Sequence, residues 1–304
     1  MFSILFLLII VSSLISVAFY TVVERKVLGY IQIRKGPNKV GILGVFQPFS
    51  DAIKLFSKSI VVTEQMNIVF SSTSPALIFI LSIIILPLIP YSKFGIFDSS
   101  FSILNFFIIS SMSVYMLLLI GWSANSKFCY LGSIRGVAQM ISYEVSFFLL
   151  FLTLAMMSHS YSFFNFNNFY KSPYLFSFSL LFGIWVITCL AETNRSPFDF
   201  AEGESELVSG FNVEYMGGWF ALIFLAEYLS MLILSMISVV VFFGTLTKFI
   251  NLPMIIIMSL SFLWVRGTFP RFRYDLLMLL NWKVFLPLVI PTLMISIPMM
   301  FISS

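Results

Sequence analysis

Eight long apolar segments constrain this chain more than any other feature of its sequence. A helix that crosses a hydrocarbon core about 30 Å thick needs roughly 20 apolar residues. The segments run approximately over residues 2–23, 67–90, 101–124, 137–158, 173–191, 215–244, 249–266 and 282–302. Of the 304 residues, 60% are hydrophobic and 10% are charged, which is more apolar side chain than a soluble core could bury. The sequence therefore predicts an all-α integral membrane protein, a single membrane domain over residues 1–304 with about eight transmembrane helices.

The residues that most often hold metals or redox groups are scarce. Cys129 and Cys189 lie far apart in apolar surroundings, and His159 is the single histidine. This set predicts no disulfide framework, no haem pair and no zinc site. We therefore expect that the chain alone binds no metal and no cofactor. The first segment lacks the basic leader and cleavage site of a signal peptide, so we expect it to be a retained span.

The basic residues are unevenly divided between the predicted loops. Three of the 17, Lys93, Lys171 and Lys248, fall on the side reached after even-numbered spans. The others lie on the opposite side: Arg25, Lys26, Arg34, Lys35, Lys39, Lys54, Lys58, Lys127, Arg135, Arg195, Arg266, Arg271, Arg273 and Lys283. By the positive-inside rule this side faces the cytoplasm or matrix, and both termini face the other compartment. The net charge of +4 thus reflects topology and indicates no nucleic-acid partner.

The first long loop contains a stretch with two different faces, residues 44–60. Phe49, Ile53 and Phe56 form an apolar stripe at helical spacing, while Asp51 and Lys54 lie on another face. This pattern predicts an amphipathic helix that lies in the membrane interface. The alternative is an ordinary surface helix beneath a soluble domain.

Four carboxyl groups lie inside or at the ends of predicted spans, where an ionised group costs about 2.5–3.5 kcal/mol at the helix centre. Glu144 lies in the fourth span and Glu227 in the sixth, while Glu24 and Glu192 end the first and fifth. Because burial penalises the charged form, such groups can exchange protons near neutral pH, as a proton relay requires. Alternatively, each is structural and paired with an arginine. We expect few basic residues at the depth of Glu144, Glu192 and Glu227, which favours the relay.

The loop over residues 192–214 places acidic groups on the otherwise basic side. Its acidic residues alternate with aromatic ones, and they are Asp199, Glu202, Glu204, Glu206 and Glu214. A loop folded back into a cavity would use both kinds of side chain. The spacing lacks the alternating Asp/Asn pattern of a helix–loop–helix calcium site. An acidic surface that docks a basic partner subunit is the alternative.

Four segments of the chain resemble the characteristic loops of a known family. They are Glu24–Gly41, Gln47–Phe56, Ala191–Tyr215 and Arg266–Asp275. In this order they are similar to the subunit 1 family of NADH:ubiquinone oxidoreductase, respiratory complex I, of the mitochondrially encoded type. The likeness covers essentially the whole chain. It implies a multi-pass protein of the mitochondrial inner membrane, within an enzyme that reduces ubiquinone and translocates protons.

The resemblance also implies partners and residue roles. In that family, peripheral-arm subunits carry FMN and iron–sulfur clusters and contact the odd-numbered loops, while small and antiporter-like membrane subunits lie alongside. The first span, the amphipathic helix and the sixth span are implied to frame the channel through which ubiquinone enters, with Arg25, Arg34, Arg195 and Phe224 at matching positions. The implied proton path consists of Glu24, Asp51, Glu144, Glu192 and Glu227. The implied coupling loop contains Asp199, Glu202, Glu204 and Glu206.

Three other interpretations stay open at this point. A stand-alone ion transporter would also place carboxyl groups within the membrane, but such folds usually show repeated halves, and the sequence has no clear repeat. The homologous subunit of a membrane-bound hydrogenase need not bind a quinone. A purely structural anchor for the peripheral arm would need no proton-exchanging carboxyl group.

Overall fold

Helices are the only regular secondary structure in the computed structural model, which describes residues 2–90, 99–169, 175, 178–203, 207–244 and 248–303. The longest helices are α1 (Phe2–Ile31), α3 (Ile68–Ile85), α4 (Ser102–Ser123), α5 (Lys127–Met157), α10 (Gly218–Phe243), α11 (Lys248–Thr268) and α13 (Leu286–Ser303). The shorter ones are α2 (Gln47–Ser57), α6 (Phe163–Phe169), α8 (Ser179–Glu192) and α12 (Tyr274–Leu280). A π-helical turn at Asn281–Phe285 joins α12 to α13, and short 3-10 turns occupy Ile42–Gly44, Leu86–Leu88 and Gly210–Asn212.

The described part of the chain contains seven helical segments that are long and apolar enough to cross a membrane. They are Ser3–Ile31, Ile68–Leu88, Ser102–Ser123, Lys127–Met157, Gly218–Phe243, Asn251–Thr268 and Tyr274–Pro298. These segments match seven of the eight predicted spans, and the all-α membrane class is confirmed. The predicted fifth span corresponds to α8, a shorter apolar helix of 14 residues, and it begins at residues that lie outside the described ranges. The sidedness of the termini stays a prediction.

The starting point of α5 differs from the prediction. The helix begins at Lys127 rather than at residue 137, because the side chain of Ser126 accepts a hydrogen bond from the Cys129 backbone N–H at 3.4 Å. A serine in this capping position satisfies an otherwise unpaired amide of the first turn. The first turns of α5, residues 127–136, are therefore helical, although their polar residues kept them outside the span that was predicted from hydrophobicity.

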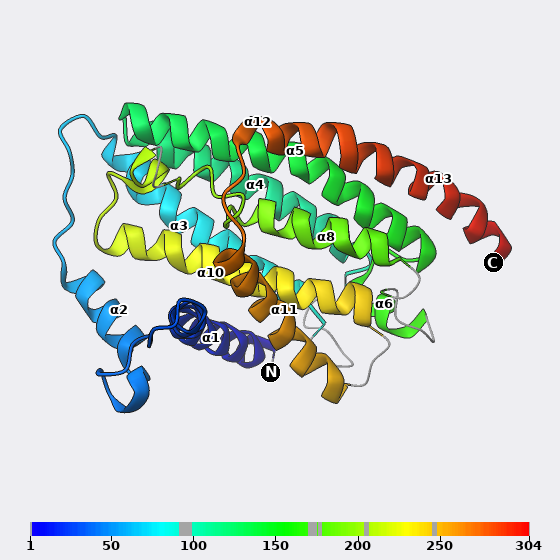
Figure 1. Ribbon diagram of the computed structural model, residues 1–304, viewed down its shortest axis with the longest axis horizontal. Helices are drawn as coiled ribbons and strands as arrows, with labels where there is room; N and C mark the ends of the chain where they lie inside the picture. The colour runs from blue at the N-terminus through cyan, green and yellow to red at the C-terminus, as the bar shows by residue number, and fades with distance from the viewer. Residues whose placement is uncertain are drawn as a thin grey trace.

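The helices form one bundle in which α10 has a central place (Figure 1). Helix α10 packs against α1, α3 and α11, while α5 packs against α4, α8 and α13. Helix α1 presents a buried face of Val17, Tyr20 and Glu24, spaced three and four residues apart, while Leu7 and Leu8 on its other side are exposed. A helix that is apolar on its exposed side as well suits a lipid environment. The bundle therefore carries one of its ionisable groups, Glu24, on a face that points inward.

Aromatic side chains fill the centre of the bundle between α4, α5, α8 and α10. The rings of Phe147 and Trp185 stack at 4.7 Å between centroids, and Phe151 meets Trp185 edge-on at the same distance. Phe242 lies 5.5 Å from Trp185, and Phe106 lies 5.9 Å from Phe151. Offset and edge-to-face pairs of this kind add about 0.5–1.5 kcal/mol each beyond the area that they bury. This cluster fixes the helices that carry the polar residues described below.

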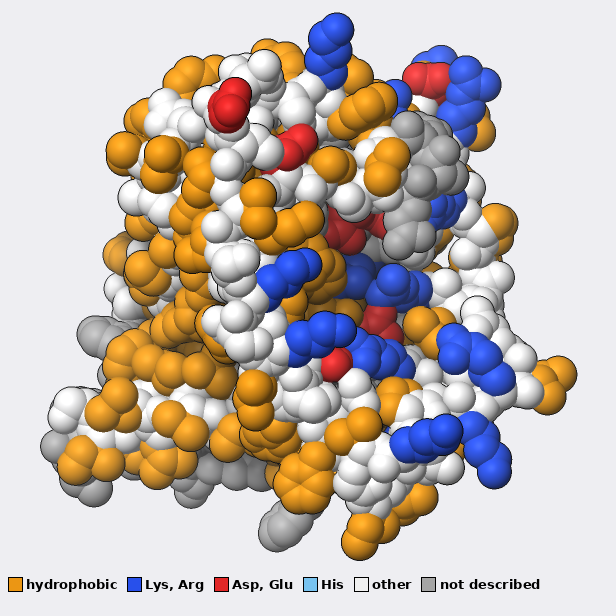
Figure 2. Space-filling view, turned by 90° about the vertical axis from the view of Figure 1, so that its left-hand side faces the viewer, with side chains coloured by type: hydrophobic (Ala, Val, Ile, Leu, Met, Phe, Trp, Pro, Cys, Tyr) orange, Lys and Arg blue, Asp and Glu red, His pale blue; other side chains and the backbone are white. Residues whose placement is uncertain are grey.

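Helix α2 lies beside the bundle, where it contacts α1 and α10 (Figure 1). It occupies Gln47–Ser57, within the predicted stretch 44–60. The predicted apolar stripe is strongly exposed, with Phe49, Ile53 and Phe56 retaining 48, 70 and 64% of their surface, and Phe46, directly before the helix, retains 60%. That α2 lies in the membrane interface stays a prediction. Figure 2 looks onto this end of the molecule and shows Lys and Arg side chains around a hollow, with acidic side chains deeper inside.

Candidate functional site: a buried cluster of carboxyl and guanidinium groups

Glu24 forms the first part of a polar cluster where α1, α10 and α11 meet. Its side chain is buried, and its Oε2 accepts a hydrogen bond from the Tyr228 hydroxyl of α10 at 2.5 Å. Arg266, near the end of α11, forms an ion pair with the other carboxylate oxygen. The Tyr20 hydroxyl, one turn earlier on α1, donates to the backbone carbonyl of Ser259 on α11 at 2.9 Å. Both oxygens of Glu24 are thus bonded, as a buried carboxylate requires.

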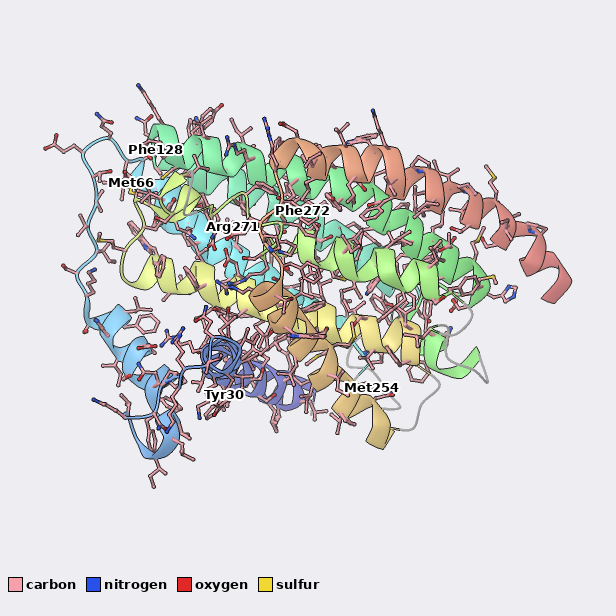
Figure 3. The ribbon with its side chains drawn as sticks, in the orientation of Figure 1. Tyr30, Met66, Phe128, Met254, Arg271 and Phe272 are labelled. Atoms are coloured by element: carbon pink, nitrogen blue, oxygen red, sulfur yellow. The ribbon has the colours of Figure 1, made fainter. Side chains whose placement is uncertain are left out.

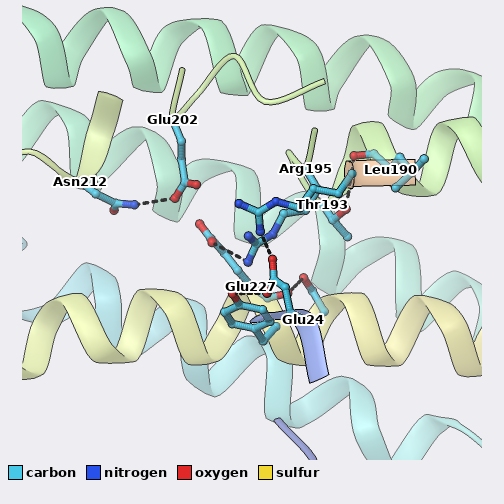
Figure 4. Close-up of polar contacts among 10 residues, drawn as sticks. Glu24, Leu190, Thr193, Arg195, Glu202, Asn212 and Glu227 are labelled. Carbon is cyan, nitrogen blue, oxygen red and sulfur yellow. Dashed lines mark hydrogen bonds and ion pairs between the residues drawn. The ribbon is translucent and has the colours of Figure 1, made fainter. Parts of the chain in front are cut away.

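Arg195 joins this group to the loop that follows α8. The side chain is buried, and the carbon at the centre of its guanidinium group lies 4.4 Å from the centroid of the Tyr228 ring, a cation–π geometry. Its Nη2 lies 3.8 Å from Oε2 of Glu227, one residue before Tyr228 on α10 (Figure 4). Tyr228 therefore contacts the cation of Arg195 through its ring and the anion of Glu24 through its hydroxyl.

Glu202 is a further member of the cluster, and it lies in the same loop as Arg195, between α8 and α10. Its Oε1 accepts a hydrogen bond from Nδ2 of Asn212 at 2.8 Å (Figure 4), and its carboxyl group lies close enough to that of Glu227 for the two to interact electrostatically. Burial raises the pKa of Glu202 from 4.5 to about 7, an effect that Arg195 opposes and Asp199 reinforces. Because two neighbouring carboxylates repel each other, the pair is favoured when it shares one proton, and Glu202 can take up or release a proton near neutral pH.

Asp199 occupies a second buried position in the same loop. Its Oδ2 lies 3.5 Å from Nη2 of Arg271, which belongs to the connection between α11 and α12. The next residue, Phe272, donates its backbone N–H to the carbonyl of Pro197 at 3.1 Å. Figure 3 labels Arg271 and Phe272 where this connection crosses the bundle. The acidic loop is therefore fixed by the C-terminal part of the chain and does not extend freely into solvent along its described residues.

A cavity of about 100 Å³ connects Glu227 with Glu192. Both carboxyl groups line it, together with the hydroxyl groups of Ser82, Ser110 and Ser230. Most of the other lining side chains are apolar, Leu117 and Leu234 among them, so the two carboxyl groups and the three hydroxyl groups are the places where water in this space can find hydrogen-bond partners. One buried carboxylate oxygen of Glu192, Oε2, has no hydrogen-bond partner among the described residues. The cavity can therefore accommodate a short chain of water between two acidic groups.

Glu144 lies beyond Glu192 on the other side of the bundle. It projects from α5 into a surface hollow that Phe107, Ile141 and Phe148 help to line, and it is partly exposed. The two carboxyl groups are close enough to interact electrostatically. The order along the bundle is thus Glu24 and Glu202 near Glu227, then the cavity, then Glu192 and Glu144.

Of the residues expected at the quinone channel, Arg25 lies on α1 and Phe224 on α10, whereas Arg34 and Arg195 lie in the loops that follow α1 and α8. Arg25 forms an ion pair with Asp51 of α2 at 2.8 Å, and Nε2 of Gln47 donates to the same carboxylate at 2.8 Å. The ring of Phe224 lies 6.4 Å from that of Tyr228, which places it next to the Glu24 group. Arg34 is exposed and bonds the side chain of Gln32, away from the cluster.

Sequence reasoning thus identified some members of this site and missed others. Glu24, Arg195, Glu202 and Glu227 come together, whereas Arg34 does not join them, and Glu204 and Glu206 lie outside the described residues. The expectation that few basic residues share the depth of Glu144, Glu192 and Glu227 was wrong for Glu227, which pairs with Arg195. Glu24 is also paired, with Arg266. Arg266, Arg271 and Asn212 were not selected, although all three fall in segments that carry the family resemblance. In the described ranges, no three His, Cys, Asp or Glu side chains come together to hold a metal ion.

A helical membrane bundle with a connected set of carboxyl and guanidinium groups inside it defines a class: a polytopic membrane protein that keeps charge within the bilayer. The profile of a family described as NADH dehydrogenase matches residues 4–297. "NADH-ubiquinone oxidoreductase chain 1" of Locusta migratoria is 51% identical over 292 residues, which is 95% of this chain and 92% of the relative. The protein of the same name from Aedes aegypti is 50% identical over 284 residues, 93% of this chain and 90% of the relative.

The similarity extends to vertebrates. The chain 1 protein of Balaenoptera physalus is 43% identical over 315 residues, covering 99% of this chain and 98% of the relative. The chain therefore belongs to the family of NADH-ubiquinone oxidoreductase chain 1, the mitochondrially located membrane subunit of complex I. It is a multi-pass protein of the mitochondrial inner membrane and a subunit of an enzyme, and the expected family is confirmed. The comparisons favour this family over a stand-alone transporter or a hydrogenase subunit.

Proposed function

We propose that this chain frames the channel through which ubiquinone enters complex I and supplies the carboxyl groups that couple quinone reduction to proton translocation. The observation that carries the proposal is the cavity that both Glu227 and Glu192 line, together with the neighbouring positions of the Glu202 and Glu227 carboxyl groups. Water between neighbouring acidic groups is the arrangement that proton transfer needs. The loop that contributes Glu202 is the element through which quinone chemistry reaches this path.

The quinone channel is proposed to open between α1, α2 and α10. The rings of Phe19 on α1 and Phe49 on α2 meet edge-on at 6.3 Å, and those of Phe220 and Phe224 on α10 lie 4.4 Å apart. Aromatic and apolar walls suit the hydrocarbon tail of a ubiquinone, while the Arg25–Asp51 pair stands where the polar headgroup passes. A photoreactive, long-tailed quinone analogue should therefore label peptides from α1 and α10. Labelling confined to peripheral-arm subunits would contradict the channel.

The partners follow from membership in complex I. We propose that the basic end seen in Figure 2 faces the matrix and contacts the peripheral-arm subunits that carry FMN, the iron–sulfur clusters and the quinone headgroup site. Both termini would then face the intermembrane space. The small and antiporter-like membrane subunits are proposed to lie beside the bundle near Glu144, whose partly exposed carboxyl group needs a covering partner within the membrane.

The coupling role is tested with Glu192→Gln in the assembled complex. Because the amide cannot take part in proton exchange, coupled NADH:ubiquinone turnover should fall at least about ten-fold, a loss of 1.4 kcal/mol in transition-state stabilisation. NADH oxidation by an artificial acceptor that bypasses the quinone should stay unchanged. Glu64→Gln is the matched control, since Glu64 is exposed in the loop after α2. Unchanged turnover and pumping in the Glu192 variant would leave the chain as a structural anchor of the peripheral arm.

A further inference from the structure

The connection between α11 and α12 holds the acidic loop by several contacts of different kinds. The Phe272 backbone N–H bonds the carbonyl of Pro197 at 3.1 Å, and the Arg271 guanidinium lies 3.5 Å from the Asp199 carboxylate. The rings of Phe198 and Phe272 are 5.5 Å apart. A hydrogen bond, an ion pair and a ring contact on three neighbouring loop residues make the two segments move together. A displacement of the acidic loop therefore also displaces α12, the helix that directly follows Arg271 and Phe272 (labelled in Figure 3).

At its other end, α12 and the π turn that follows are bonded to α5. Asn281, the first residue of the π turn, is fully buried and donates Nδ2 to the backbone carbonyl of Ser142 at 2.5 Å. The hydroxyl of Tyr143 donates to the carbonyl of Leu277 on α12 at 3.1 Å, and the Tyr143 ring meets that of Phe285 at 6.3 Å. Single π turns are rare within helices and are frequent at functional sites.

The polar character of Asn281 needs a reason. Its surroundings are buried, and its Oδ1 has no hydrogen-bond partner among the described residues. A leucine would fill a similar volume without the desolvation cost of an amide. The bond to α5 is the interaction that the amide makes and a leucine cannot. This bond reaches α5 two residues before Glu144, the carboxyl group that interacts with Glu192 across the bundle.

We propose that Asn281 is a positioning residue: through the Ser142 carbonyl it fixes the Ser142–Glu144 segment of α5 relative to the acidic loop, so that Glu144 is held in place for proton exchange with Glu192. The inference rests on the proposed function of Glu144. It adds a mechanical link, over residues 271–285, from the loop near the quinone to the far end of the carboxyl path. The Tyr143 hydroxyl contributes a second, parallel bond in the same link.

The test uses Asn281→Leu, Glu144→Gln and the double variant in the assembled complex. Asn281→Leu should lower coupled turnover by roughly 3- to 10-fold, the range that loss of one buried hydrogen bond allows. The KM for ubiquinone should not change, because the residue lies away from the proposed channel. In the Glu144→Gln background, Asn281→Leu should have no further effect, since the group that it positions is already inactive. Tyr143→Phe, which removes only a hydroxyl, should give a smaller loss with the same dependence on Glu144 and keeps the test informative if the leucine variant does not assemble.

A matched control removes a buried polar contact elsewhere. Ser102→Ala deletes the hydroxyl that accepts from the Phe163 backbone N–H at 2.8 Å, far from the acidic loop, and should leave turnover unchanged. Losses from Asn281→Leu and Glu144→Gln that multiply would show a general structural effect and overturn the inference. A Glu144→Gln variant with full activity would instead overturn the proposed function of Glu144. A raised KM for ubiquinone in Asn281→Leu would place its effect at the quinone channel and also contradict the positioning role.

Discussion

Glu202→Gln offers the most direct test of the electrostatics of the cluster. Burial raises the pKa of Glu202 from 4.5 to about 7, so the folded protein binds this proton more tightly than the unfolded chain does. Below about pH 4.5 the group is protonated in both states, and its burial carries no charge penalty. As the pH rises from 4.5 to 7 the unfolded chain loses the proton first, and the folded protein becomes less stable. Above pH 7 the loss of stability no longer changes with pH.

The size of this loss follows from the same two pKa values. A change of one pKa unit corresponds to about 1.36 kcal/mol, so the rise from 4.5 to about 7 lowers the free energy of unfolding by about 3 kcal/mol. Glutamine does not ionise and keeps a donor toward the Glu227 carboxyl group. The variant should therefore gain stability relative to the parent protein between pH 5 and pH 8. Relative coupled turnover should change over the same range if the Glu202–Glu227 pair releases its shared proton during the reaction.

The assay is thermal denaturation of the purified complex, followed for this subunit from pH 5 to pH 9. The difference in midpoint between Glu202→Gln and the parent protein should grow with pH and level off near pH 8. Glu64→Gln, which changes an exposed carboxyl group, should show a difference that does not depend on pH. A pH-independent difference for Glu202→Gln as well would refute the reasoning, because it would mean that Glu202 is ionised at all these pH values.

Two further substitutions test the structural account of the site. Arg266→Gln should destabilise the subunit by about 3–5 kcal/mol, because it strands the buried Glu24 carboxylate with Tyr228 as its remaining bonded partner. Glu24→Gln should cost less, since the Arg266 side chain is 32% exposed and can reach water; equal losses in thermal stability would contradict the asymmetry. Gly210→Ala should lower the amount of assembled complex on native gels, because Gly210 has a φ of +57° and an added Cβ would collide with the backbone of the acidic loop. Gly183→Ala is its control: a Cβ there meets nothing within 4 Å, and the change should stabilise α8 by about 0.5–1 kcal/mol.

The sequence predicts the helices of this protein much better than it predicts the contacts between them. Apolar length and the positions of Glu24 and Glu227 are local properties, and in the structure Glu24 is buried within α1, which continues beyond the predicted end of the first span to Ile31. The Glu24–Arg266 pair joins residues 242 positions apart, so no periodicity along the chain could reveal it. Its discovery requires knowing that α1 and α11 are neighbours.

The same limit explains the other differences. Asn281 directly precedes the predicted span 282–302 and carries no signal of its own in the sequence, whereas in the structure it begins the π turn and its amide reaches the carbonyl of Ser142 on α5. The early start of α5 depends on a serine cap, which a hydrophobicity pattern does not register. The short α8 is apolar but ends after 14 residues, where the loop turns inward with Arg195 buried. The amino-acid composition indicates that the protein lies in lipid, whereas the site depends on contacts between side chains of different helices.

The depth of Glu227 has an electrical consequence. Nine residues separate it from Gly218 at the start of α10, a distance of about 14 Å along the helix, close to half of a hydrocarbon core about 30 Å thick. A proton that travels from the basic end of the bundle to this carboxyl group therefore crosses about half of the membrane's electric field. A full crossing is worth about 2.3 kcal/mol per 100 mV, so this step is worth about 1 kcal/mol per 100 mV. The membrane potential thus acts on occupancy of the Glu202–Glu227 pair with an energy comparable to that of one of its hydrogen bonds.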